Sequence, residues 1–215
     1  MSLQHALLGV LEARPMSGYD LVRFFDGSSR WIWAAPQSQI YPTLRRMEEA
    51  GLIQGDDEAR GPRLTRTVYT VTPAGLTELR RWLELPGKPT PVRDHMLLQA
   101  LNFDMIDPQA AHEVLDRFIT EQDKEAEEAE AHRDRLLHRD TPLLRERLSR
   151  RDPADHERIV RLKAHVFDGL AAVARTRAEW ARQGQHLLRE DYGENPQDER
   201  SEGTVGKSGP DAERA

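Results

Sequence analysis

The chain has 215 residues, of which 32% are charged and 38% hydrophobic, and its net charge is −6 at pH 7. This composition is more typical of a small core with long solvated helices than of one large globule. The lack of cysteine excludes disulfides and thiolate zinc sites, and no apolar run approaches the roughly 20 residues of a membrane span. No basic region precedes a hydrophobic stretch at the N-terminus, so we expect no signal peptide, no membrane partner and a cytoplasmic location.

The negative charge is unevenly distributed along the chain. Residues 1–89 carry a net charge of +1, residues 90–192 carry −4 and residues 193–215 carry −3. Local patches of charge matter more than the total charge for binding to a phosphate backbone. The N-terminal part is therefore a candidate for nucleic-acid binding although the whole chain is acidic.

Helical periodicity dominates the first fifty residues. Apolar residues recur at helical spacing in three segments, residues 2–13, 18–25 and 36–50. Ser17 is placed to cap the second of these helices, and Gly51 is placed to end the third.

Extended segments separate and follow these helices. We predict them at residues 31–33, 52–56 and 65–72, the last with β-branched, alternating character. Thr72 then caps a helix that begins at Pro73 and continues to about residue 85. The order helix, helix, strand, helix, hairpin, helix is that of a winged helix-turn-helix. We therefore expect a mainly α fold with a small β-hairpin wing.

The third predicted helix has one apolar and one polar face. Ile40, Leu44 and Met47 fall on one stripe at about 100° per residue. The opposite side carries polar residues and a proline, with Tyr41 on the flank: Ser38, Gln39, Pro42, Arg45 and Arg46. Serine and glutamine can hydrogen-bond base edges, and arginine can read guanine or hold phosphate. We interpret this segment as a recognition helix, with an ordinary solvated helix face as the alternative.

The loop of the predicted hairpin is basic at its end. Arg60, Arg63 and Arg66 lie within seven residues that contain no acid. A wing inserted near the minor groove would use this charge. A simple soluble turn is the alternative, because three acids at 56–58 immediately precede the arginines.

Beyond a proline-containing linker at 86–91 the pattern is wholly helical. Helices are predicted over residues 92–103, 108–137 and 154–190, and Asp107-Pro108 and Asp152-Pro153 are typical helix starts. We expect an N-terminal winged-helix domain over residues 1–86, a C-terminal helical domain over 91–191 and a disordered tail over 192–215.

The last predicted helix carries an apolar stripe with alternating steps of three and four residues, broken at Arg177 and Gly184. Its members are Ile159, Leu162, Val166, Leu170, Val173, Trp180 and Leu187. Such a stripe is typical of a coiled-coil contact, so the C-terminal domain is predicted to dimerise. The predicted interface residues are Leu162, Val166, Leu170, Val173 and Trp180. A monomeric hairpin is the alternative, in which the 108–137 helix covers the stripe with Leu115, Phe118 and Ile119.

Three stretches of the sequence are familiar: LLGVL at 7–11 with PMSGYDL at 15–21, QIYPTLRRMEEAGLI at 39–53, and YTVTPAG at 69–75. Together they resemble the PadR family of transcriptional regulators, densely over residues 3–85, and the IYP run is their most specific part. Residues 91–94 and the following apolar segment resemble the start of the family's longer type of C-terminal domain.

The resemblance implies a homodimer that represses transcription by binding palindromic operators in double-stranded DNA. Some family members are released by small aromatic or planar ligands, so a small aromatic effector is a further implied partner. The family pattern maps DNA contacts onto Tyr19 and the third helix and wing. The complete predicted set is Tyr19, Ser38, Gln39, Tyr41, Arg45, Arg46, Arg63 and Arg66. Tyr19 as a core residue of the second helix is an alternative.

The sequence contains no catalytic constellation and no close pair of metal ligands, so we expect no enzyme, no metal and no cofactor. Residues 203–208 are similar to a phosphate-binding loop, but Ser201 stands where its first glycine is required. A protein-interaction adaptor whose winged helix does not bind DNA is the alternative function, favoured by the acidic overall charge.

Overall fold

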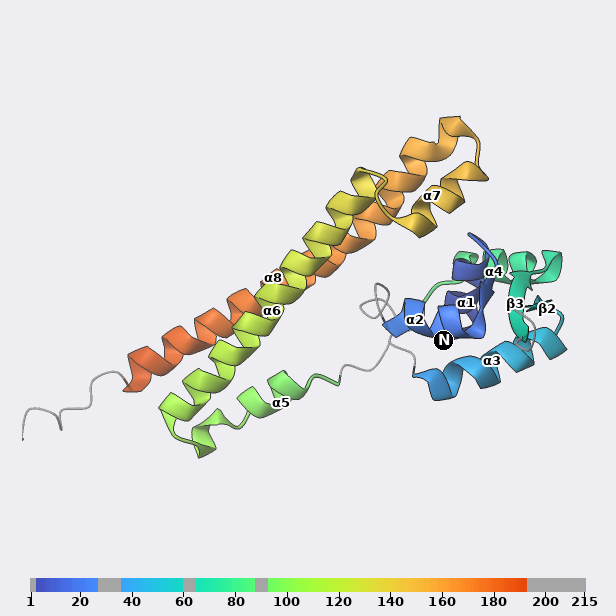
Figure 1. Cartoon of the computed structure of the whole chain (residues 1–215). Coiled ribbons are helices and arrows are strands. Elements are labelled where there is room, and N and C mark those ends of the chain that lie inside the picture. Colours follow the sequence, from blue (N-terminus) through green and yellow to red (C-terminus); the bar gives the residue numbers. More distant parts are fainter. Residues whose placement is uncertain (1–2, 27–35, 60–64, 88–92, 193–215) are drawn as a thin grey trace, which may run out of the picture. The chain divides into compact units, whose positions relative to one another are not determined.

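The structure, a computed structural model, describes residues 3–26, 36–59, 65–87 and 93–192 (Figure 1). The predicted strand at 31–33, the wing arginines Arg60 and Arg63, and the predicted tail beyond residue 192 lie outside the described residues. The chain divides into two compact units. The winged unit comprises Met1–Pro91 and His132–Val166, and the distal unit comprises Val92–Ala131 and Phe167–Ala215.

The part of the winged unit before residue 88 combines helices with a small antiparallel sheet (Figure 1). Its helices are α1 (Leu3–Leu11), α2 (Gly18–Asp26), α3 (Gln37–Glu49) and α4 (Pro73–Glu84). Its strands are β1 (Met16–Ser17), β2 (Ile53–Ala59) and β3 (Thr65–Val71), in the order β1-β3-β2. The predicted mainly helical fold with a β-hairpin wing is confirmed, and β1 adds a strand that the sequence analysis missed.

One apolar core joins the N-terminal helices. Its fully buried side chains include Leu7, Leu8, Leu11, Leu21, Ile40, Leu44 and Met47. The predicted stripe of the third helix, Ile40, Leu44 and Met47, is therefore confirmed as buried. A side chain of this kind contributes roughly 1.5–3 kcal/mol when it leaves water. The stripe thus determines which face of α3 remains in solvent.

Local sequence sets the ends of these helices. Thr72 Oγ1 accepts a hydrogen bond of 3.1 Å from the amide of Gly75, which is the predicted cap of α4. The amide of Asp20 donates to Ser17 Oγ at 3.2 Å, as expected for the start of α2. Gly51 follows α3 with a φ of +69°, a conformation that glycine adopts without steric penalty.

The predicted helix over 92–103 is wrong in extent. The structure has a short helix, α5 (His95–Ala100), followed by one 3-10 turn, η1 (Phe103–Met105). Asp94 sets the start of α5, because its carboxylate accepts hydrogen bonds from the amides of Met96 and Leu97 at 3.0 and 3.2 Å. Capping at this position ends the extended segment before the helix.

The winged unit also contains a helix that was not predicted, α7 (Pro142–Ser149), and a 3-10 turn, η2 (Pro153–Asp155). Arg147 of α7 donates a hydrogen bond of 2.7 Å to the backbone oxygen of Gly9 and a second one to the carboxylate of Glu12. These contacts attach α7 to α1 and to the residue that follows it.

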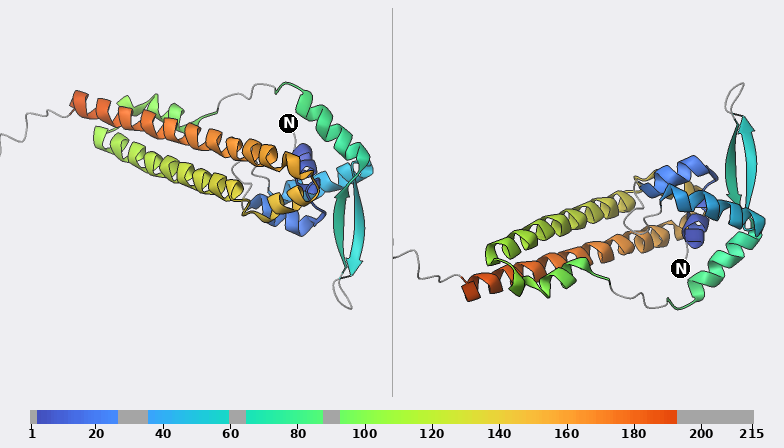
Figure 2. Two further views of the ribbon diagram at one scale, coloured as in Figure 1. Left: turned by 90° about the horizontal axis from the view of Figure 1, so that it is seen from above. Right: turned by 90° about the horizontal axis from the view of Figure 1, so that it is seen from below.

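The distal unit contains α5, η1 and parts of two long helices, α6 (Pro108–Leu137) and α8 (His156–Tyr192). Within it the two helices lie side by side and run in opposite directions (Figure 2). Arg182 forms an ion pair with Asp123, and Arg175 forms one with Glu130 at 2.8 Å. Small buried side chains allow close approach of the two helices. They are Ala126, Ala129, Ala171, Ala174, Ala178 and Ala181.

Candidate nucleic-acid interface

The outward face of α3 is polar and uncovered. Its predicted contact residues Ser38, Gln39, Arg45 and Arg46 are all exposed. Arg46 lies back along its own helix, donating to Thr43 Oγ1 at 3.1 Å and to the oxygen of Pro42. Arg45 has no hydrogen bond or ion pair with any described residue, so its guanidinium is available to a ligand.

Tyr41 connects α3 to the start of α2. A Cβ atom added at Gly18 would lie 2.6 Å from Tyr41 Cε1, so a larger residue at position 18 would displace this ring. The neighbouring Tyr19 is 59% exposed, which contradicts the alternative that it is a core residue. The guanidinium of Arg23 lies 5.9 Å from the centre of the Tyr19 ring. An aromatic ring with an adjacent cation therefore lies at the start of α2, next to α3.

The wing arginine that the structure describes is already paired. Arg66 forms an ion pair of 3.0 Å with Glu58, which faces it across the hairpin, and approaches Asp20 of α2 to 3.7 Å. Thr67 Oγ1 donates to Asp57 at 2.8 Å. The acids that precede the wing are thus partly neutralised within the hairpin. Arg63 lies outside the described residues.

Two residues at the base of the wing were missed by the sequence analysis. Glu48 of α3 accepts a hydrogen bond of 3.0 Å from the amide of Gly55, which joins α3 to β2. Burial raises the pKa of Tyr69 on β3, and the carboxylate of Glu48 acts in the same direction, so its hydroxyl stays protonated as a donor. Tyr69 lies in one of the familiar stretches, which was the only signal pointing to it.

The predicted interface on α8 is exposed in the single chain. The α8 stripe is defined as these predicted interface residues, Leu162, Val166, Leu170, Val173 and Trp180. Its exposure ranges from 37% at Trp180 to 61% at Val173, except that Leu170 is half-buried. α6 covers a different face of α8, where Leu115 and Ile119 cluster with Ala181. Phe118 of α6 contacts Trp180, so the alternative holds at this one stripe residue, while Leu162, Val166 and Val173 stay exposed in the single chain.

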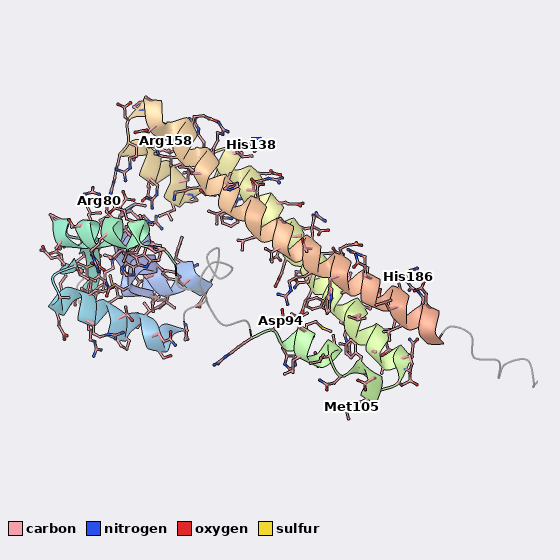
Figure 3. All side chains as sticks on the ribbon, turned by 180° about the vertical axis from the view of Figure 1, so that it is seen from behind. Arg80, Asp94, Met105, His138, Arg158 and His186 are labelled. Atoms are coloured by element: carbon pink, nitrogen blue, oxygen red, sulfur yellow. The ribbon has the colours of Figure 1, made fainter. Side chains whose placement is uncertain are left out.

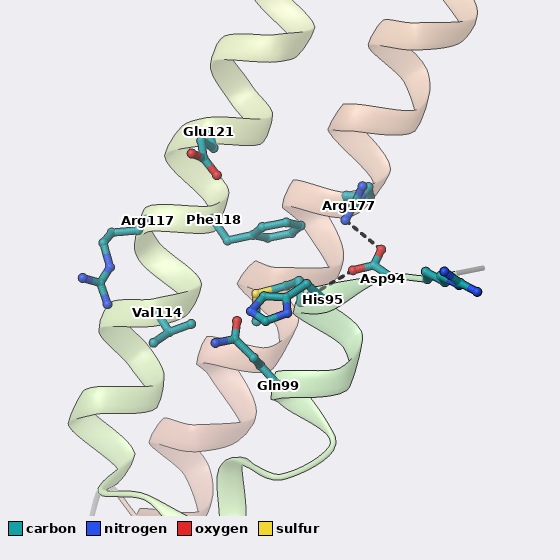
Figure 4. Close-up of a pocket in the computed structure, with 10 residues that line it drawn as sticks. Asp94, His95, Gln99, Val114, Arg117, Phe118, Glu121 and Arg177 are labelled. Atoms are coloured by element: carbon teal, nitrogen blue, oxygen red, sulfur yellow. Dashed lines mark hydrogen bonds and ion pairs between the residues drawn. The ribbon is translucent and has the colours of Figure 1, made fainter. Parts of the chain in front are cut away.

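A cavity of about 470 Å³ lies in the distal unit, between α5 and the two long helices (Figure 4). Asp94 and Arg177 form an ion pair of 2.7 Å at its edge. The Arg177 guanidinium lies 5.1 Å from the centre of the Phe118 ring, and Trp180 meets that ring edge-on at 6.3 Å. The cavity presents an aromatic ring beside a charged pair.

No described helix has both the length and the apolar character needed to cross a membrane. Among the described residues, no three acidic or histidine side chains are grouped to hold a metal ion.

The Transcriptional regulator PadR-like family matches residues 7–81. The negative transcriptional regulator PadR of Bacillus subtilis is 33% identical over 114 residues, which cover 52% of this chain and 62% of the relative. The probable transcriptional regulator Rv1176c of Mycobacterium tuberculosis is 39% identical over 90 residues, which cover 42% of this chain and 48% of the relative. The chain thus matches less than two thirds of the length of either relative.

Solved structures share the fold over most of the chain. Bacillus subtilis PadR in complex with operator DNA has a TM-score of 0.67 and 23% identity, covering 87% of this chain and 99% of that chain. The same protein in complex with p-coumaric acid has a TM-score of 0.63, 23% identity and coverages of 88% and 96%. The Vibrio cholerae virulence activator AphA has a TM-score of 0.59, 24% identity and coverages of 88% and 99%.

Proposed function

Because the chain carries a PadR-like domain over residues 7–81, we propose that it is a transcriptional regulator that binds double-stranded DNA. The observation that carries the proposal is the exposed polar face of α3, which lies opposite a fully buried stripe. A helix of this kind fits the major groove, where Ser38 and Gln39 would hydrogen-bond base edges. Arg45, which has no partner among the described residues, would bind guanine or phosphate.

The residues around this face would bind the phosphate backbone. Tyr19 and Tyr41 carry hydroxyls that can donate to phosphate oxygens. On binding, Arg66 would leave Glu58 and Asp20 and contact a DNA phosphate. The loss of these ion pairs would reduce the contribution of Arg66 to the binding free energy. Arg63 of the wing and Arg46 of α3 complete the proposed contact set.

The active species would be a homodimer joined through the α8 stripe. An exposed apolar stripe of this kind favours an interface, and most of it stays exposed in the single chain although Phe118 of α6 contacts Trp180. Two winged helices fixed by such a contact would read the inverted half-sites of a palindromic operator. Repression is the proposed outcome, because the curated Bacillus subtilis relative is a negative regulator.

A small aromatic acid would act as effector, because Bacillus subtilis PadR forms a complex with p-coumaric acid. The cavity beside Phe118 is its proposed site in this chain, since a planar ring can stack there near the Arg177 guanidinium. Titration with p-coumaric acid should quench the fluorescence of Trp180, and Phe118→Leu should weaken this response. An unchanged titration curve for this variant would exclude the cavity as the effector site.

Selection of bound sequences from a random DNA pool tests the proposed function. A regulator should enrich a palindrome, and its affinity for that site should fall steeply with salt, because bound phosphates release counterions. A protein-interaction adaptor would enrich nothing. A reporter fused to the selected site then decides the direction of control, since the structural relatives include an activator as well as a negative regulator.

A further inference from the structure

A second cavity, of about 290 Å³, lies in the winged unit between α7, η2 and the beginning of α8. It is lined by four cationic side chains, Arg147, Arg151, Arg158 and Lys163. Figure 3 shows Arg158 near the N-terminal end of α8. Ile159 and Leu162 supply apolar lining on the same helix.

The carboxylates around this cavity do not balance its positive charge. Glu12 accepts hydrogen bonds from both Arg147 and Arg151. Asp155 forms an ion pair of 2.8 Å with Arg158. The nearby Arg14 and Glu146 pair with each other at 2.8 Å and leave the balance unchanged. Among the cations that line the cavity and the carboxylates that pair with them, four cations thus face two carboxylates, an excess of two positive charges.

Lys163 is the cation without a direct partner. It is mostly shielded from solvent, and its ammonium forms no hydrogen bond or ion pair with the residues that the structure describes. Burial lowers the pKa of Lys163 to about 8, and the positive charge of Arg147 acts in the same direction, whereas the carboxylate of Glu12 acts in the opposite one. A partly buried ammonium is costly unless an anion accompanies it.

We propose that this cavity binds a small organic dianion, either a phosphate monoester or a dicarboxylate. Two negative charges would balance the two excess positive charges. Arginine guanidiniums match the oxygen geometry of phosphate and carboxylate groups, and Lys163 adds a point charge. Ile159 can accommodate a short apolar part of the ligand. The volume lies just below the usual range of small-molecule sites, so the ligand is small.

Binding of the dianion would affect the winged helix, because two arginines that line the cavity also contact the end of α1. Arg147 and Arg151 hold Glu12, at the end of α1, with the same guanidinium groups that line the cavity. A bound dianion therefore competes with Glu12 and loosens the attachment of α7 to α1. An effect on DNA affinity rests on the proposed function, whereas binding of the dianion does not.

Calorimetric titration with inorganic phosphate and with succinate tests the site, with acetate as the monoanion control. At least one dianion should bind saturably with one site per chain, and the tighter probe identifies the ligand class. Lys163→Met should weaken that binding about tenfold or more, because a charge-assisted hydrogen bond is lost. The matched control Lys124→Met, on the exposed surface of α6, should bind like the unmodified protein.

Glu12→Gln separates a ligand site from a cluster that only anchors α1. It removes the internal competitor, so the dianion should bind severalfold more tightly even if the variant is less stable. Binding of dianions no better than acetate would overturn the proposal, as would equal affinities for Lys163→Met and the unmodified protein. A loss of DNA affinity in Lys163→Met without any added dianion would instead assign the cluster to the DNA backbone.

Discussion

Replacing two valines of the α8 stripe with glutamate should dissociate the proposed homodimer without unfolding the chain. Val166 and Val173 lie seven residues apart on one face of α8 and are 47% and 61% exposed in the single chain. The exposed parts of these two side chains contact no other described residue of the single chain, so replacing them should remove little packing from the monomer. Glutamate also has a higher helix propensity than valine, so α8 should keep its helical content.

The size of the effect follows from the area that the partner must cover. Full burial of a valine contributes roughly 1.5 kcal/mol or more, so the half that is still exposed contributes about 1 kcal/mol. A symmetric dimer holds four of these side chains, and the loss is about 4 kcal/mol, or about a thousandfold in the dimer dissociation constant. Burial of the introduced carboxylates adds to this loss.

Sedimentation velocity at micromolar concentration measures the outcome, and circular dichroism checks the fold. The control Ala172→Glu, on an exposed part of α8 away from the stripe, should remain a dimer. Ala171→Glu should instead reduce helical content, because Ala171 is buried in the contact with α6. If the double valine variant still sediments as a dimer, the interface lies elsewhere, with the exposed Leu97 and Leu98 of α5 and the following Leu101 as the next candidates. A native protein that is monomeric at this concentration would refute the dimer itself.

The remaining predictions concern the winged helix. Gln39→Ala and Arg45→Ala should each weaken operator binding by about 1–3 kcal/mol with unchanged circular dichroism, and unchanged affinity of the double variant would refute the groove assignment. Alanine at both Arg63 and Arg66 should reduce the slope of log affinity against log salt by about 2, and equal slopes would leave the wing outside the interface. Gly18→Ala should lower the melting temperature and operator affinity together, because its Cβ displaces the Tyr41 ring; full affinity would show that this ring does not contact DNA.

The sequence predicted those elements whose local signals agree with their packing. α6 has the predicted bounds because a proline start and a long helical pattern point to the same segment. Three apolar residues at helical spacing predicted the buried stripe of α3. Because this stripe faces the core, the polar residues on the opposite side of the helix were predicted to face solvent. By contrast, β1 has two residues and exists because Met16 and Ser17 pair with β3, which no local pattern reveals.

Tertiary contacts explain what the sequence could not supply. α7 is short and largely polar, and its attachment depends on Arg147 reaching Glu12, which is far away along the chain. On α8 the large apolar residues marked one stripe, but the face that meets α6 is made largely of alanine and gave a weaker signal. The pairing of Arg66 with Asp20 likewise joins separate elements. The sequence therefore did not predict the environment of side chains whose partners lie far away along the chain.

Lys163 also makes the stability of the protein depend on pH in a defined direction. Burial lowers the pKa of Lys163 from 10.5 to about 8 in the folded state, and the charge of Arg147 adds to this shift. Between these values the unfolded chain binds more protons than the folded chain, so the free energy of unfolding should rise from pH 8 to pH 10.5. A shift of this size corresponds to about 3 kcal/mol.

Urea unfolding of the unmodified protein and of Lys163→Met at pH 7, 8.5 and 10 isolates this contribution from other groups that titrate in the range. The difference in stability should favour the methionine variant at pH 7 and shrink as the pH rises, because the cost of the buried charge disappears when Lys163 loses its proton. Lys124→Met should track the unmodified protein at every pH. Dianion affinity should decrease through the same interval, since the arginines of the cavity keep their charge while Lys163 loses its own. A pH-independent stability difference between Lys163→Met and the unmodified protein would show that the Lys163 ammonium is solvated, and the proposed site would then lose the desolvated charge that favours a bound anion.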